Sequence, residues 1–280
     1  MNSAIRDMVV DVAELAEAEA MFQLESGAPP QVRAALGMRT ARIGGGVALL
    51  MRAEGGRFWS KAVGLGFDVP VSGELLDEVI DFYQSNHARM AVLQVAPAVL
   101  PLDWARLREE RGIQEGASWL KLAHDLSWIE LPADAPRVTR VGPDQAARWA
   151  TVLVRGFGLA ETGVVDIWAA TVGRPGFVAF AAWDGAKMIA AANLFRYGNT
   201  VSLCGAATLP GYRRRGAQSA LLAARLADAR ETGCQWAFAE TGAETAGAHN
   251  ASLHNMRRAG FSVRYARANW HWKSRTGLAD

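Results

Sequence analysis

The sequence has few cysteines and no long hydrophobic run. Cys204 and Cys234 are its only cysteines, and their spacing fits neither a zinc-binding nor a redox motif, so neither a disulfide framework nor a bound metal is expected. No apolar segment approaches the roughly 20 residues that span a membrane. The first residues include Arg6, Asp7 and Asp11 and lack the apolar core of a signal peptide. These absences predict a soluble cytoplasmic protein with no membrane partner.

A strong excess of charge of either sign is also missing. The chain has 30 Lys and Arg against 28 Asp and Glu, which gives a formal net charge of +2. If Arg213–Arg215 bound nucleic acid, the affinity of the protein for nucleic acid would fall steeply with salt concentration. The modest net charge and the lack of alternating aromatic and basic residues argue against that interpretation. No nucleic-acid partner is predicted, and a homodimer is left open.

The chain is long enough for two ordinary domains. It has 280 residues, half of them hydrophobic, so it can bury a sizeable core. Its composition changes once, at Leu131–Arg137, where two prolines occur without apolar periodicity. We therefore predict a first domain at residues 1–128, a linker at 129–137 and a second domain at 138–275.

The second half predicts a mixed order of strands and helices. The Asp184-Gly185 pair between two apolar runs indicates a hairpin, and Gly233 and Gly260 are typical helix ends. The predicted strands are 137–141, 177–183, 187–197, 201–209, 235–240 and 261–272, and the predicted helices begin at Pro143, at Val165, after Gly216 and after Asn250.

The first half repeats this order in outline. Ser72 is a typical N-cap, and a helical stripe of apolar residues follows it at Leu75, Leu76, Val79, Ile80 and Tyr83. Strands are predicted at 57–66, 90–95 and 118–122, with a helix at 102–111 closed by Gly112. The predicted fold class is therefore α+β, with two similar domains that combine strands and helices.

The most informative segment is T-L-P-G-Y-R-R-R-G-A-Q-S-A-L-L-A, from Thr208 to Ala223. It runs from the end of a strand through a basic turn with a glycine into a helix. The first N–H groups of a helix have no partner within it, and the helix dipole leaves partial positive charge there, so phosphate binds well at such a point. This segment predicts an anion-binding helix start.

The same segment resembles the acyl-CoA-binding motif of the GNAT N-acetyltransferase superfamily. That motif has Arg or Gln, two residues, Gly, one residue, then Gly or Ala. Arg213 and Gly216 match it, and Gln218 departs from it. The flanking residues also match, with Pro210 and Tyr212 before the turn and S-A-L-L after it.

A second segment resembles a later GNAT motif. In H-N-A-S-L-H-N-M-R-R-A-G-F, Asn250 opens a short helix and Gly260-Phe261 closes it. The resemblance implies that Asn250 contacts the pantetheine arm of the cofactor. It also implies two tandem GNAT-like domains, each a mostly antiparallel mixed sheet flanked by helices. The first would be degenerate, because its corresponding turn, Asp68–Gly73, has no arginine and places an acid where phosphate would lie.

The resemblance implies an acetyl-CoA-dependent N-acetyltransferase that acts on a small-molecule amine in a ternary complex. The strand before the turn would be splayed from its neighbour, so that pantetheine pairs with its edge. The residues that would bind acetyl-CoA are Thr208, Leu209, Arg213, Arg214, Arg215, Gly216, Ala217, Gln218, Ser219 and Asn250.

The side chains for proton transfer do not follow the family. The usual glutamate position is Cys204, and the usual tyrosine falls on Met256 or Arg257. Glu240 is the candidate base and His254 the candidate acid.

Other assignments are open. Tyr265 and Ser252 are weaker candidate acids, Cys204 is interpreted as a small buried hydrophobe, and Asp166 or Glu161 could hold a cationic amine. The alternative function is a non-catalytic CoA-binding or interaction protein.

Overall fold

The computed structural model describes residues 3–54, 58–130, 132, 135–245 and 248–274. The chain forms two compact units. The first comprises the chain up to Ser26, Arg33–Leu120 and the chain from Tyr265, and the second comprises Gly27–Val32 and Lys121–Arg264. The predicted domain bounds remain a prediction, but residues 265–274 belong to the same unit as most of the first half.

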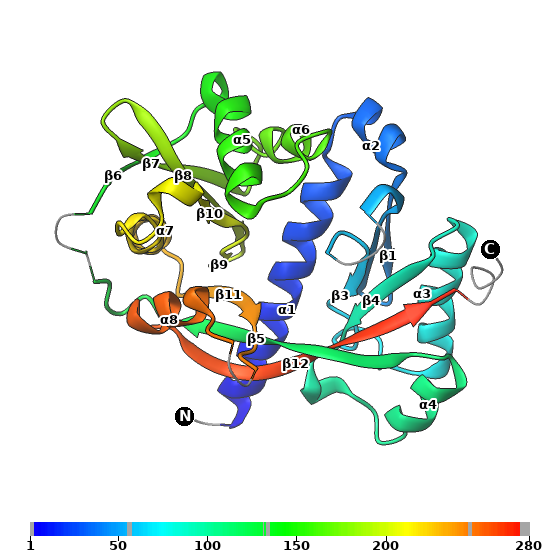
Figure 1. Cartoon of the computed structure of the whole chain (residues 1–280). Coiled ribbons are helices and arrows are strands. Elements are labelled where there is room, and N and C mark those ends of the chain that lie inside the picture. Colours follow the sequence, from blue (N-terminus) through cyan, green and yellow to red (C-terminus); the bar gives the residue numbers. More distant parts are fainter. Residues whose placement is uncertain (1–2, 55–57, 131, 133–134, 246–247, 275–280) are drawn as a thin grey trace. The chain divides into compact units, whose positions relative to one another are not determined.

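The first half begins with two helices and then alternates strands with helices (Figure 1). In order, the elements are α1 (Ser3–Ser26), α2 (Pro30–Leu36), β1 (Met38–Ile43), β2 (Gly46–Met51), η1 (Arg52–Glu54), β3 (Lys61–Val63), α3 (Gly73–Ser85), β4 (Met90–Gln94), η2 (Pro97–Val99), α4 (Trp104–Glu110) and β5 (Gln114–His124).

The second half has a closely similar order. Its elements are β6 (Arg137–Arg140), η3 (Pro143–Gln145), α5 (Ala146–Phe157), α6 (Val164–Ala169), β7 (Phe177–Asp184), β8 (Lys187–Tyr197), β9 (Thr200–Ser202), β10 (Ala206–Thr208), η4 (Pro210–Tyr212), α7 (Ala217–Glu231), β11 (Trp236–Gly242), α8 (Ala251–Arg258) and β12 (Ser262–Lys273). Among the described residues, no helix is both long and apolar enough to cross a bilayer.

Strand pairing repeats between the halves. In the first, β1 pairs antiparallel with β2, β2 antiparallel with β3, and β3 parallel with β4. In the second, β7 pairs antiparallel with β8, β8 antiparallel with β9, and β9 parallel with β11. The predicted class, mixed sheets flanked by helices, is confirmed.

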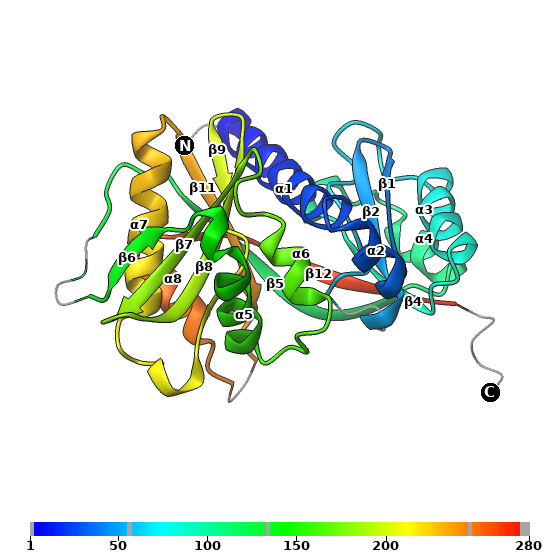
Figure 2. The ribbon, with the colours of Figure 1, turned by 90° about the horizontal axis from the view of Figure 1, so that it is seen from above.

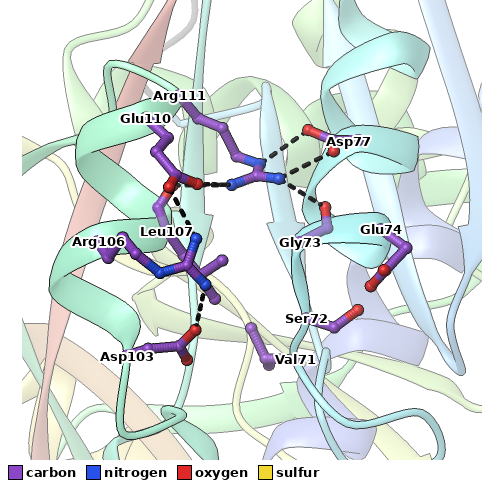
Figure 3. Close-up of a pocket in the computed structure, with 10 residues that line it drawn as sticks. All are labelled: Val71, Ser72, Gly73, Glu74, Asp77, Asp103, Arg106, Leu107, Glu110 and Arg111. Atoms are coloured by element: carbon purple, nitrogen blue, oxygen red, sulfur yellow. Dashed lines mark hydrogen bonds and ion pairs between the residues drawn. The ribbon is translucent and has the colours of Figure 1, made fainter.

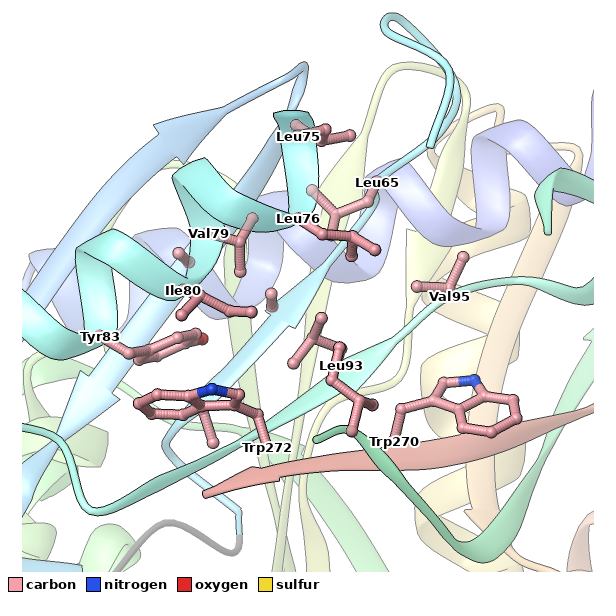
Figure 4. Close-up of a cluster of buried hydrophobic side chains, with 14 of the residues drawn as sticks. Leu65, Leu75, Leu76, Val79, Ile80, Tyr83, Leu93, Val95, Trp270 and Trp272 are labelled. Atoms are coloured by element: carbon pink, nitrogen blue, oxygen red, sulfur yellow. The ribbon is translucent and has the colours of Figure 1, made fainter. Parts of the chain in front are cut away.

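The core of the first unit lies beneath α3 (Figure 4). Ser72 caps this helix, because its hydroxyl accepts a hydrogen bond from the N–H of Leu75 at 3.3 Å. The predicted apolar stripe of α3 is fully buried, and Tyr83 stacks on Trp272 of β12 with ring centroids 6.0 Å apart. The strand β12 pairs antiparallel with β4, Asn269–Lys273 against Met90–Gln94. Packing therefore explains why the chain end belongs to this unit.

A buried ionic cluster also fixes β12 in the first unit. Arg267, of which 1% is exposed, pairs with Glu14 and with Glu17 of α1, the latter at 2.9 Å. The hydroxyl of Tyr265 donates to Glu14 Oε1 at 2.6 Å. Burial, followed by the charge of Glu14, raises the pKa of Tyr265 well above its usual value. Such buried charges are tolerated because each has partners.

The second unit places β7 and β8 between α5 and α7 (Figures 1 and 2). Trp149 of α5 is completely buried and donates its indole N–H to the carbonyl of Phe180 in β7 at 2.9 Å. Gly158 ends α5 in a left-handed conformation with φ 72°. This packing holds the strands that lead to the start of α7.

Two predicted strands differ from the structure. The predicted strand 57–66 forms only Lys61–Val63, and residues 55–57 lie outside the described part of the chain. The predicted strand 201–209 is interrupted between β9 and β10, where Gly205 has φ 68°. A Cβ at Gly205 would lie 2.8 Å from Trp168, so the close packing of that indole requires glycine. Of the predicted linker, residues 131, 133 and 134 are outside the description, and residue 137 already begins β6.

Candidate functional site

The start of α7 has the features of an anion-binding turn. Arg214 and Gly216 have φ values of 62° and 77°, and such backbone turns gather N–H groups on one side. Gly216 is the N-cap residue, and no side chain caps the helix. The first intrahelical bond is from the N–H of Ala220 to the carbonyl of Gly216, at 2.9 Å. The N–H groups of the first turn are thus left for a ligand.

The three arginines of the turn differ in their surroundings. The guanidinium of Arg213 donates to the carbonyl of Gly156 at 3.0 Å and to that of Thr208 at 3.4 Å. Arg215 lies over the ring of Tyr212, 5.2 Å from its centroid. Arg213 therefore holds the turn in place through α5 and β10, while the exposed Arg214 and Arg215 supply positive charge to the surface of the turn.

Gln218, the departure from the GNAT motif, ties α7 to β10. Its side-chain amide donates to Thr208 Oγ1 at 2.8 Å. Ala217 is buried, Ser219 is half-buried in the first turn of the helix, and Leu209 donates its N–H to the carbonyl of Ile189 in β8 at 3.0 Å. The structure thus brings all the predicted residues from Thr208 to Ser219 together in one strand–turn–helix segment.

The strand before the turn separates from its neighbour. The N–H of Leu203 donates to the carbonyl of Phe238 in β11 at 2.8 Å, and β9 pairs with β11 only as far as Ser202. Beyond this point β10 pairs with β8, while β11 continues to Gly242. This is the splay that the resemblance implies.

The open edge of β10 follows from its pairing. The N–H of Asn193 donates to the carbonyl of Gly205 at 2.9 Å, and that of Leu209 donates to Ile189. Because peptide groups alternate in direction along a strand, those of Ala206 and Thr208 point away from β8. An extended ligand can pair with this edge as an added strand would.

Asn250 connects the end of β11 to the start of α8. Its carbonyl oxygen Oδ1 accepts from the N–H of Leu253 at 3.1 Å, and its amide Nδ2 donates to Thr241 Oγ1 at 3.0 Å and to the carbonyl of Gly242 at 2.6 Å. The predicted N-cap is confirmed, and Gly260 follows the helix with φ 93°. These bonds occupy the side chain of Asn250 within the protein. Its contact with pantetheine remains a prediction.

The two candidates for proton transfer lie on adjacent elements of the second unit. Glu240 is half-buried on the part of β11 beyond its pairing with β9. His254 is on α8, and its Nε2 is 2.9 Å from Glu244 Oε1. Glu244 also accepts the N–H of Asn250 at 2.8 Å, and this bond, together with His254, lowers the pKa of its carboxyl. Sequence reasoning missed Glu244, because it lies in a loop where no periodicity marks it.

The weaker candidates have other surroundings. Tyr265 belongs to the first unit and is bonded to Glu14, and Glu161 is ion-paired with Arg155 at 2.7 Å. Asp166 is in the first turn of α6, and Ser252 is exposed in α8. The interpretation of Cys204 as a buried hydrophobe is only partly right, because it is half-buried in the break between β9 and β10. Desolvation raises the pKa of its thiol to about 12, so the thiol stays protonated near neutral pH.

In the first unit, the corresponding helix start is that of α3, and it is surrounded by more acidic than basic side chains (Figure 3). A pocket of about 460 Å³ lies beside the start of α3, between Val71 and Leu107. Its charged side chains are Glu74, Asp77, Asp103, Glu110, Arg106 and Arg111. The two arginines, which the sequence analysis did not place here, are both ion-paired: Arg111 with Asp77 at 2.8 Å, and Arg106 with Asp103 and Glu110. The surplus of carboxylates disfavours phosphate, and that this half is a degenerate copy remains a prediction.

Comparisons with known proteins agree with this geometry. The model of the acetyltransferase (GNAT) family matches residues 149–261. This range contains both motifs, from β10 to the end of α8, and confirms the resemblance. No curated protein sequence matches the chain.

Solved structures share the fold at low identity. A GCN5-related N-acetyltransferase from Kribbella flavida is 19% identical with a TM-score of 0.59, and the match covers 96% of this chain and 98% of that one. A GCN5-related N-acetyltransferase from Sphaerobacter thermophilus is 14% identical with a TM-score of 0.57, covering 94% and 92%. A tandem GNAT protein from the clavulanic acid biosynthesis pathway is 16% identical with a TM-score of 0.54, covering 98% and 96%. At these identities the likeness shows the fold alone.

Proposed function

We propose that the chain transfers an acetyl group from acetyl-CoA to the amine of a small molecule, because residues 149–261 match the model of the acetyltransferase (GNAT) family. The observation that carries this proposal is the uncapped start of α7 beside the open edge of β10. Backbone N–H groups at one point, and next to it a strand edge that pairs with no other described strand, fit a diphosphate joined to an extended arm.

Different groups of the turn and of β10 bind different parts of acetyl-CoA. The N–H groups from Arg214 to Ser219 bind the diphosphate, and Arg214 and Arg215 add positive charge. The edge of β10 at Ala206 and Thr208 aligns the pantetheine arm. An N–H group on this edge also stabilises the negative charge that develops on the thioester oxygen when the amine attacks.

Proton transfer falls to Glu240 and His254 in this proposal. The amine attacks only when it is neutral, and Glu240 accepts the proton that the amine loses on attack. The imidazole of His254, held by Glu244, donates a proton to the departing thiolate. The amine attacks the thioester directly, so no covalent intermediate forms on the protein.

The experiment is thiol release from acetyl-CoA with a panel of small amines, compared between the wild type and Glu240→Gln and His254→Gln. General acid–base catalysis contributes roughly 10²- to 10⁴-fold, so each variant is expected to lose turnover within that range and to keep its acetyl-CoA affinity. The matched control is Glu231→Gln at the exposed end of α7. If Glu240→Gln and His254→Gln both turn over like the wild type, this assignment of roles is wrong.

A second candidate function is a CoA-binding protein without chemistry. It is favoured by the two residues at the family's usual proton-transfer positions, because neither can exchange a proton near neutral pH. The pKa of the Cys204 thiol is raised to about 12, and Met256 is buried and has no ionisable group. Tight binding of acetyl-CoA with no thiol release for any amine in the panel would support this second candidate over the first.

A further inference from the structure

We propose that Glu244, His249 and His254 form a binding site for a borderline divalent cation such as Zn²⁺. One ligand atom from each of these residues lies within 4.8 Å of the other two. No metal was predicted from the sequence, because the spacing of these three residues matches no recognised metal-binding motif. In the structure, Glu244 and His249 lie close to His254 of α8.

The distances match those of a metal site with small adjustments. Glu244 Oε1 is 2.9 Å from His254 Nε2 and 3.8 Å from His249 Nδ1. Around a tetrahedral Zn²⁺ with bonds of 2.0–2.1 Å, neighbouring ligand atoms are about 3.3 Å apart. Both observed distances differ from this value by about half an ångström or less.

The orientation of the rings supports the same inference. The imidazoles of His249 and His254 are stacked, with centroids 4.4 Å apart and planes inclined by 27°. Each presents a nitrogen to the same carboxylate oxygen. Two imidazole nitrogens beside one carboxylate oxygen form a set of ligands that a single divalent cation can bind.

The chemistry of the three ligands selects the class of cation. Two imidazoles and one carboxylate suit Zn²⁺, Co²⁺ or Ni²⁺, while Mg²⁺ and Ca²⁺ prefer sites made of oxygen. The N–H of Asn250 donates to Glu244 Oε1 at 2.8 Å and so fixes the position of this carboxylate. Three protein ligands leave at least one position for water.

The test is a titration of the untagged full chain with ZnCl₂ by calorimetry, with Co²⁺ absorption as a second readout. The wild type is expected to bind one Zn²⁺ and to give the intense visible bands of tetrahedral Co²⁺. His249→Asn and Glu244→Gln are expected to weaken Zn²⁺ binding by about 10- to 100-fold or more. His87→Asn is the matched control, because His87 is exposed and has φ 57°, which asparagine tolerates. Equal affinity of His249→Asn and the wild type, or no saturable binding by the wild type, would overturn the site.

A consequence for turnover rests on the proposed function. Zn²⁺ would bind Nε2 of His254, whose imidazole is assigned to donate a proton, and would inhibit acetyl transfer. His249→Asn should then resist inhibition by Zn²⁺ at concentrations that saturate the wild type. If Zn²⁺ binds by calorimetry but leaves turnover unchanged, the metal site stands and the acid role of His254 is wrong.

Discussion

Gln218 in the first turn of α7 donates its side-chain amide to Thr208 Oγ1 at the end of β10, at 2.8 Å. The bond joins the two elements that form the anion-binding turn, at a position where the GNAT motif has glycine or alanine. Thr208 is buried and Gln218 half-buried, so this bond is shielded from water. In this chain a side chain holds the strand and the helix together at the site.

Gln218→Ala should lower the free energy of unfolding by about 1 kcal/mol, the net contribution of one such hydrogen bond. Urea unfolding of Gln218→Ala, Thr208→Val and the double variant forms a cycle, and we expect a coupling energy of about 0.5–1 kcal/mol. Additive effects of the two substitutions would show that the bond contributes nothing to stability.

Arg267→Met should be strongly destabilising. It would leave the buried carboxylates of Glu14 and Glu17 without their main positive partner, and breaking a buried pair costs about 3–5 kcal/mol. Arg106→Met is the control, because Arg106 is ion-paired with Asp103 and Glu110 at the surface, where pairs contribute about 0–1 kcal/mol. Equal urea midpoints for the two variants would contradict the role given to the buried cluster.

Leu76→Ala tests the core of the first unit. Leu76 is completely buried on the apolar face of α3, so its truncation should cost about 2–5 kcal/mol. Leu102→Ala makes the same chemical change at a fully exposed side chain and should change the free energy of unfolding by less than about 0.5 kcal/mol. A loss below about 1 kcal/mol for Leu76→Ala would mean that this face of α3 is not packed as described.

Glu25 makes stability depend on pH. It is completely buried in α1, both of its carboxylate oxygens lack a hydrogen-bond partner, and burial raises its pKa well above the usual value, although Lys61 opposes the shift. The folded state therefore holds the proton more tightly than the unfolded state. The stabilisation is complete below the unfolded pKa of 4.5 and is lost as pH rises through the folded pKa.

Glu25→Gln removes this titration and keeps the shape of the side chain. The free energy of unfolding of the variant, measured by urea between pH 4.5 and 8, should fall less with rising pH than that of the wild type. The difference between them should grow toward higher pH. Parallel curves over this range would show that Glu25 does not take up a proton on folding.

Local patterns predicted the parts of the fold that depend on neighbouring residues. The helix capped by Ser72, the helix opened by Asn250 and the hairpin at Asp184-Gly185 were all predicted, because caps, apolar periodicity and turn residues act within a few positions. The turn at Gly216 was also predicted, because its motif consists of neighbouring residues.

The parts that depend on distant contacts were not predicted. At the break before β10, Trp168 packs where a Cβ of residue 205 would lie, and nothing in the sequence around Gly205 marks that contact. The packing of β12 with the first unit depends on Arg267 meeting α1, some 250 positions away. The bonds made by Arg213 and Gln218 likewise appear only once α5, β10 and α7 are assembled.

The most direct test of the account is calorimetric titration of acetyl-CoA into the wild type, Gly216→Asp and Gly211→Asp. Gly216 has φ 77° at the N-cap of α7, whereas Gly211 has open space around it and no positive φ. Both variants add one negative charge, but only Gly216→Asp places it at the N-cap and strains the backbone there. We predict that Gly216→Asp weakens binding by about tenfold or more, through backbone strain and repulsion of the diphosphate, and that Gly211→Asp weakens it much less. Unchanged binding in Gly216→Asp, or no binding in the wild type, would contradict the claim that α7 holds the diphosphate.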